Sequence, residues 1–134
     1  MKAAIFGGSA GMGRAIAEQL ASTRAELLLI ASDARDLEAV RSDLLLRYEA
    51  SRISILAMDL TRTAPEAVAR TVLESFGKFD VMFLVAGAGD DGDCGVLVPA
   101  AAERILSINF VIPASLINAI IAADALLPSV QSWR

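Results

Sequence analysis

Three glycines near the N-terminus constrain the fold of this chain more than any other feature. Gly7, Gly11 and Gly13 follow the apolar run Ala3–Phe6, and a helical pattern begins near Met12. Glycine lets the backbone turn sharply and approach a phosphate closely, and the N–H groups of the next helix's first turn then face that anion. Between a strand and a helix, this spacing predicts a turn that binds the pyrophosphate of a dinucleotide. The alternative is a glycine-rich connection that merely links strand to helix.

The rest of the chain alternates apolar runs with helical patterns. Four runs have the length and composition of buried parallel strands: Lys2–Phe6, Glu26–Ala31, Ile53–Met58 and Val81–Val85. Strands that alternate with helices are joined by right-handed crossovers and form a parallel sheet. We therefore predict a Rossmann-like α/β fold, a doubly wound sheet in three αβα layers with strand order 3-2-1-4. The domain is expected to cover residues 1–127, with residues 128–134 as an irregular tail.

Two local patterns predict details of the helices. Thr63 and Glu66 have the spacing of a capping box, in which the two side chains satisfy backbone N–H groups at a helix start. Pro113 stands within a long apolar helix and predicts a kink there, because proline cannot donate its backbone hydrogen bond.

Charge and composition exclude several classes of protein. The net charge is −4 and the basic residues are scattered singly, so the chain has no basic stripe with which to follow nucleic-acid phosphates. Ile105–Ala123 is uncharged and close to membrane-spanning length, but Ser107, Asn109 and Pro113 interrupt it. We predict no membrane span and a helix buried in a core or a subunit interface.

The single cysteine, Cys94, has no partner for a disulfide, which fits a reducing compartment. The chain is expected to be cytoplasmic. Because it contains no histidine and Cys94 has no neighbouring base, we expect no metal site and no cysteine nucleophile.

Several motifs together resemble the short-chain dehydrogenase/reductase family of NAD(P)-dependent oxidoreductases. Phe6–Gly13 resembles its Thr-Gly-x3-Gly-Ile-Gly turn, with Phe6 in place of threonine. Asp80–Gly87 is similar to its Asp-x-Leu-Val-Asn-Asn-Ala-Gly segment, although Leu84 and Val85 replace the two asparagines. The match runs nearly from end to end of the chain.

The resemblance implies roles for individual residues. The residues expected to bind the cofactor are Gly7, Ser9, Ala10, Gly11, Met12, Gly13, Ser32, Asp33, Asp59, Leu60, Ala86 and Gly87. Asp59 would contact the adenine end, or it could simply cap the turn toward Thr61 and Thr63. Asn109 matches the family asparagine that helps to hold a water in the proton-relay path, and is therefore the candidate catalytic residue. It could instead be a core asparagine with local hydrogen bonds.

The choice between NAD and NADP depends on the end of the second strand. An acidic side chain there bonds the ribose 2′-hydroxyl of NAD, whereas a basic one accommodates the 2′-phosphate of NADP. Ser32 and Asp33 stand there, and Asp33 could instead cap the next helix. Arg14 and Arg35 could reach a 2′-phosphate. These residues favour NADP slightly.

The residues that carry out catalysis in the family have no match in this chain. The family uses a serine and a tyrosine whose pKa is lowered by a lysine four residues later. The one tyrosine, Tyr48, is followed at that spacing by Arg52, and the lysines are Lys2 and Lys78. We expect the chain to be the truncated cofactor-binding part of an oxidoreductase, inactive by itself. The alternative is a non-catalytic NAD(P)H-binding or interaction module.

This truncation has a consequence for assembly. The fourth strand would be an edge strand with unpaired backbone groups, and the long helix near residues 100–123 would keep an apolar surface exposed. Such a helix commonly lies in a dimer interface in the family. We therefore expect a homo-oligomer formed through this helix.

Overall fold

The computed structural model describes residues 1–49, 51–89 and 98–126. Its strands form one parallel sheet in the order β3-β2-β1-β4, which confirms the predicted fold and strand order. The strands are β1 (Lys2–Phe6), β2 (Glu26–Ala31), β3 (Arg52–Ala57) and β4 (Val81–Leu84). The tail predicted at residues 128–134 and Cys94 lie outside the described residues.

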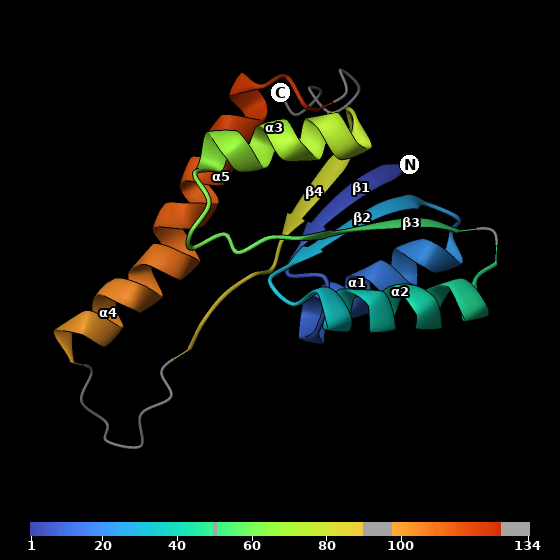
Figure 1. The fold of residues 1–134 in the computed structure, drawn as a ribbon, viewed down its shortest axis with the longest axis horizontal. Coiled ribbons are helices and arrows are strands. Elements are labelled where there is room, and N and C mark those ends of the chain that lie inside the picture. The colour runs from blue at the N-terminus through green and yellow to red at the C-terminus, as the bar shows by residue number, and fades with distance from the viewer. Residues whose placement is uncertain (50, 90–97, 127–134) are drawn as a thin grey trace, which may run out of the picture.

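Helices cover both faces of the sheet, as Figure 1 shows. The helical elements are α1 (Gly11–Ser22), α2 (Ala34–Arg47), α3 (Pro65–Phe76), α4 (Pro99–Leu106), the π-helical segment η1 (Ser107–Val111) and α5 (Ile112–Ala122). α1 and α2 lie on one face of the sheet, and α3 and α5 lie on the other.

The core is divided into two layers by the alternation of side chains along the strands. Phe6 and Ile30 point toward α3 and α5, whereas Ile5 and Leu29 point toward α1 and α2. All four side chains are fully buried. Strands covered on both faces need apolar residues at every position, which is why these runs are continuous in the sequence.

The capping box predicted at the start of α3 is wrong. The helix begins after Ala64, and among the described residues no side chain caps it. The Thr63 hydroxyl instead donates to the Asp59 carbonyl at 2.8 Å. Pro65 in the first turn needs no hydrogen-bond acceptor for its nitrogen, so the helix can start without a side-chain cap.

The irregularity in the long helix begins before Pro113. The backbone N–H of Ile112 bonds to the Ser107 carbonyl five residues back, so the helix widens into η1. Pro113 cannot donate to the carbonyl of Asn109, and a π-helical segment is one way for a helix to accommodate such a gap.

The long helix is apolar yet largely exposed. Pro99–Ala122 has 24 residues, and the mean hydropathy of its most apolar 18-residue window is 2.0. It is the one helix in the described ranges whose length and composition would suffice to cross a membrane. In its most apolar window 17% of the residues are buried. Leu116, Ala119 and Ile120 pack into the core that includes α3, so the expected core burial is confined to α5. The absence of a membrane span stays a prediction.

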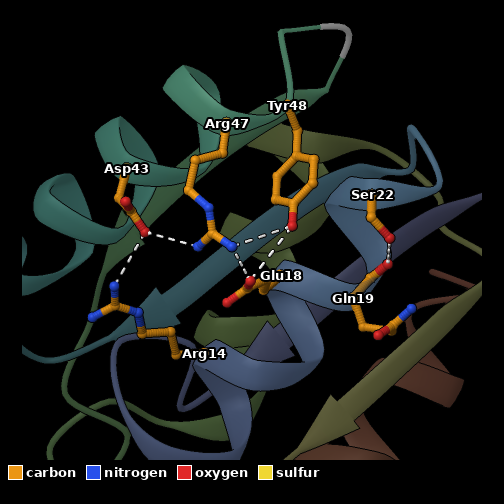
Figure 2. Close-up of polar contacts among 7 residues, drawn as sticks. All are labelled: Arg14, Glu18, Gln19, Ser22, Asp43, Arg47 and Tyr48. Carbon is orange, nitrogen blue, oxygen red and sulfur yellow. Dashed lines mark hydrogen bonds and ion pairs between the residues drawn. The ribbon is translucent and has the colours of Figure 1, made fainter.

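A polar cluster on the outer surface joins α1 to α2 (Figure 2). The Arg47 guanidinium donates to the Glu18 carboxylate and lies 3.5 Å from Asp43. Asp43 also accepts from Arg14 at 3.1 Å, and the Tyr48 hydroxyl donates to Glu18 at 3.4 Å. The cluster thus links two neighbouring helices across the surface.

The Glu18 carboxylate should make the stability of the fold depend on pH. The hydrogen bond from Arg47 lowers the pKa of Glu18. A carboxylate with a lowered pKa stabilises the folded state above its unfolded pKa of about 4.3, and that contribution is lost as the pH falls. We expect Glu18→Gln to lower the melting temperature at pH 7 and the difference between the two proteins to be smaller at pH 3. The matched control is Glu74→Gln on α3, where Glu74 forms no ion pair with any described residue. An equal difference at both pH values would contradict this prediction.

Candidate functional site

A cavity of about 480 Å³ lies at the carboxyl ends of the strands. It opens where β2 and β4 flank β1, the point at which the strand order reverses. In doubly wound sheets, ligands bind in the crevice at such a point. Ten of the residues predicted to bind the cofactor line it, namely Gly7, Ser9, Ala10, Gly11, Met12, Ser32, Asp59, Leu60, Ala86 and Gly87. The other two, Gly13 and Asp33, are not in the described lining, and neither is the candidate catalytic residue Asn109.

The glycine turn brings three backbone segments into close contact. Gly7 has a φ of +90°, and a Cβ atom there would stand 2.7 Å from the Ala86 nitrogen. At Gly13 a Cβ atom would overlap the Gly7 carbonyl oxygen and lie 2.8 Å from Val85 Cγ2. Gly13 therefore lets α1 pack on the end of β1 and does not itself line the cavity.

The N-terminus of α1 faces the cavity without a side-chain cap. Ala10 is the N-cap residue, and no described side chain accepts from the first turn, which contains no acidic residue. Gly11 and Met12 of this turn line the cavity. The first N–H groups of a helix lack intrahelical partners and carry part of the positive end of the helix dipole. This edge of the cavity is therefore suited to an anion.

The end of β2 places Ser32 in the cavity lining and turns Asp33 toward α2. The Asp33 carboxylate accepts from the backbone N–H groups of Arg35 at 2.8 Å and Asp36 at 3.4 Å, and from the Arg35 guanidinium at 3.2 Å. The guanidinium and these N–H groups lower the pKa of Asp33. Asp33 is therefore the N-cap residue of α2, which is the alternative role that the sequence left open.

The loop after β3 contributes the one ionisable side chain of the described lining, Asp59. Its Oδ1 accepts from the Thr61 hydroxyl at 2.6 Å and from the Thr61 N–H at 2.9 Å. These bonds, the one from the hydroxyl above all, lower the pKa of Asp59. Asp59 both caps its turn and lines the cavity, so its two predicted roles are compatible.

Asn109 fixes the segment that follows β4. Its Nδ2 donates to the Ala88 carbonyl at 2.7 Å and to the Ile105 carbonyl at 2.9 Å, and its Oδ1 accepts from the Ala88 N–H at 3.3 Å. A Cβ atom at Gly87 would stand 2.7 Å from that Oδ1, so only glycine fits there without a shift. Asn109 thus supports the cavity wall from outside.

The long helix contributes an apolar wall that the sequence analysis did not predict. Ile108, Ile112, Pro113 and Leu116 line the cavity beside the end of β4. Their apolar character was visible in the sequence, but it could not distinguish a cavity wall from an ordinary helix face.

Tyr48 and both lysines lie away from the cavity. Tyr48 belongs to the α1–α2 cluster of Figure 2. The Lys2 ammonium donates to the Phe76 carbonyl, and Lys78 is paired with Asp124. None of these three side chains is in the described lining.

Comparisons with known proteins point to one family. The family profile described as short chain dehydrogenase matches residues 1–126. The short-chain dehydrogenase/reductase FrzI of Cladobotryum sp is 29% identical over 119 residues, which cover 88% of this chain and 46% of that protein.

Solved structures give the same result. A metagenomic short-chain oxidoreductase in complex with NADP is 31% identical, with a TM-score of 0.79 over 92% of this chain and 56% of that one. L-sorbose reductase from Gluconobacter frateurii, complexed with NADPH and L-sorbose, is 25% identical, with a TM-score of 0.78 over 91% of this chain and 46% of that one. This chain spans about half the length of these three relatives.

Proposed function

Because the chain belongs to the short-chain dehydrogenase family of oxidoreductases, we propose that its cavity binds a nicotinamide dinucleotide. The observation that carries this proposal is the first turn of α1, which has no side-chain cap and lines the cavity. It follows the glycine turn in which Gly7 closely approaches Ala86. The pyrophosphate would lie over Gly11 and Met12, where backbone N–H groups can bond its oxygens. When bound, the nicotinamide ring would supply a hydride donor or acceptor.

The remaining lining residues divide the proposed site into two halves. Ser32, Asp59 and Leu60 come from the β2 and β3 side, which suits the adenosine half of the ligand. Ala86 and Gly87 form the wall at β4, where small residues leave room for the rest of the dinucleotide. In this proposal the contribution of Asn109 is to hold that wall in place.

We further propose that this chain binds the cofactor but does not turn over a substrate by itself. Reduction of a carbonyl needs a proton donor beside the carbonyl oxygen. Asp59 is the one ionisable side chain of the described lining, and its lowered pKa keeps it ionised at neutral pH. For a protein with the full length of the relatives, the reaction we propose is hydride transfer between NAD(P)H and a carbonyl or alcohol.

A charge placed at the start of α1 tests the binding site. Ala10 lines the cavity and is exposed, and a carboxylate near a helix N-terminus favours the folded helix. We expect Ala10→Glu to fold normally but to weaken NADPH binding at least tenfold, or about 1.4 kcal/mol, because it repels the pyrophosphate. Titration calorimetry measures this, with the exposed α2 variant Ala39→Glu as the control of equal charge. Failure of the unmodified chain to bind either NADPH or NADH would refute the proposed function.

NADP is the proposed cofactor in preference to NAD. The Asp33 carboxylate caps α2 and is not in the described lining, whereas Ser32 lines the cavity. Arg14 and Arg35, the two candidates for a 2′-phosphate, are paired with Asp43 and Asp33, and neither is in the described lining. We expect NADPH to bind more tightly than NADH in the same titration. A preference for NADH of more than about tenfold would overturn this proposal.

We also propose that the chain self-associates through the long helix. Phe110 and Ile121 are 69% and 62% exposed on it, and large apolar exposed surfaces mark interaction sites. Sedimentation should detect a dimer or larger species, and Phe110→Ser combined with Ile121→Ser should shift it toward monomer. Leu46 on α2 is 83% exposed, so Leu46→Ser removes a similar side chain elsewhere and should change nothing. A monomer at all concentrations of the unmodified chain would contradict this proposal.

A further inference from the structure

The segment after β4 forms a cavity wall from backbone and very small side chains. Ala86, Gly87 and Ala88 line the cavity, and Gly89 follows them directly. The N–H groups of Val85 and Ala86 bond to the Phe6 carbonyl at 2.9 and 3.1 Å, so the start of the segment is fixed to β1. Beyond that point, two glycines give the backbone wide conformational freedom that binding would have to remove.

Two side chains of the long helix restrain the other end of this segment. Asn109 bonds to both backbone groups of Ala88, and the Arg104 Nη2 donates to the Gly89 carbonyl at 3.3 Å. Arg104 stands five residues before Asn109, and in an unbroken α-helix residues five apart diverge in direction. Arg104 belongs to α4 and Asn109 to η1, yet their side chains bond to two adjacent residues, Gly89 and Ala88.

We propose that Arg104 is a positioning residue for the dinucleotide. This inference rests on the proposed function of the cavity. Arg104 does not line the cavity, so it acts through Gly89: it fixes the carbonyl at the end of the wall, while Asn109 fixes the residue before it. Together they preorganise Ala86–Ala88 for the part of the ligand at β4. The guanidinium suits this task because it stays charged and donates a charge-assisted hydrogen bond at any ordinary pH.

This role predicts that the two halves of the ligand respond differently. The adenosine half would lie against Ser32, Asp59 and Leu60, which come from other loops and do not depend on the wall. Adenosine 2′,5′-bisphosphate should therefore bind independently of Arg104. NADPH extends to the wall at β4, so its affinity should depend on Arg104.

The experiment compares two ligands on Arg104→Gln, Arg104→Lys and the control Arg70→Gln on the exposed side of α3. We expect Arg104→Gln to raise the Kd for NADPH about threefold to tenfold, the range for one lost hydrogen bond. The Kd for adenosine 2′,5′-bisphosphate and the melting temperature should stay unchanged. Arg104→Lys should retain most of the affinity, because an ammonium can also donate to the Gly89 carbonyl.

Three outcomes would overturn the inference. An unchanged Kd for NADPH in Arg104→Gln would show that Asn109 suffices, and the proposed function would stand. An equal loss for both ligands, with a lowered melting temperature, would show a merely structural role. Failure of the unmodified chain to bind either NADPH or NADH would refute the proposed function itself, and the inference with it.

Discussion

The close approach of backbone at the end of β1 is the contact on which the site depends. At Gly7 the backbone packs closely against the Ala86 nitrogen. At Gly13 the backbone of α1 packs against the Gly7 carbonyl. A side chain at either position would force β1, β4 and α1 apart. Their contact sets the first turn of α1 at the mouth of the cavity and the wall after β4 beside it. The edge suited to an anion and the wall at β4 therefore form together.

Burial on both faces made the sheet predictable from sequence. Strands such as Glu26–Ala31 must be apolar at every position, and their alternation with helices left one simple strand order. Helix details were harder to predict because competing local partners decide them. Thr63 fits a capping box, yet its hydroxyl bonds to the Asp59 carbonyl. Pro113 predicted an irregular helix. Whether the irregularity is a kink or the π-helical segment η1 depends on packing that no local sequence pattern encodes.

The candidate site was predictable where a residue acts through its own backbone. Gly7 and Gly11 adopt positive φ values that glycine favours, and their spacing predicted the turn. Contacts between distant segments were not predictable in the same way. Asn109 and Ala88 are separated by 21 residues and meet because η1 lies against the segment that follows β4. The apolar wall from Ile112 and Leu116 was missed because apolar residues pack a core and line a cavity equally well.

The central claim is that the first turn of α1 and the wall after β4 hold a nicotinamide dinucleotide. Amide hydrogen exchange of the 134-residue chain with and without NADPH tests it most directly, because exchange reports each backbone segment separately whatever the oligomeric state. The account predicts slower exchange in peptides that cover residues 7–13 and 85–89 and unchanged exchange in α2. Unchanged exchange at residues 7–13 under saturating NADPH, or protection confined to other segments, would contradict it.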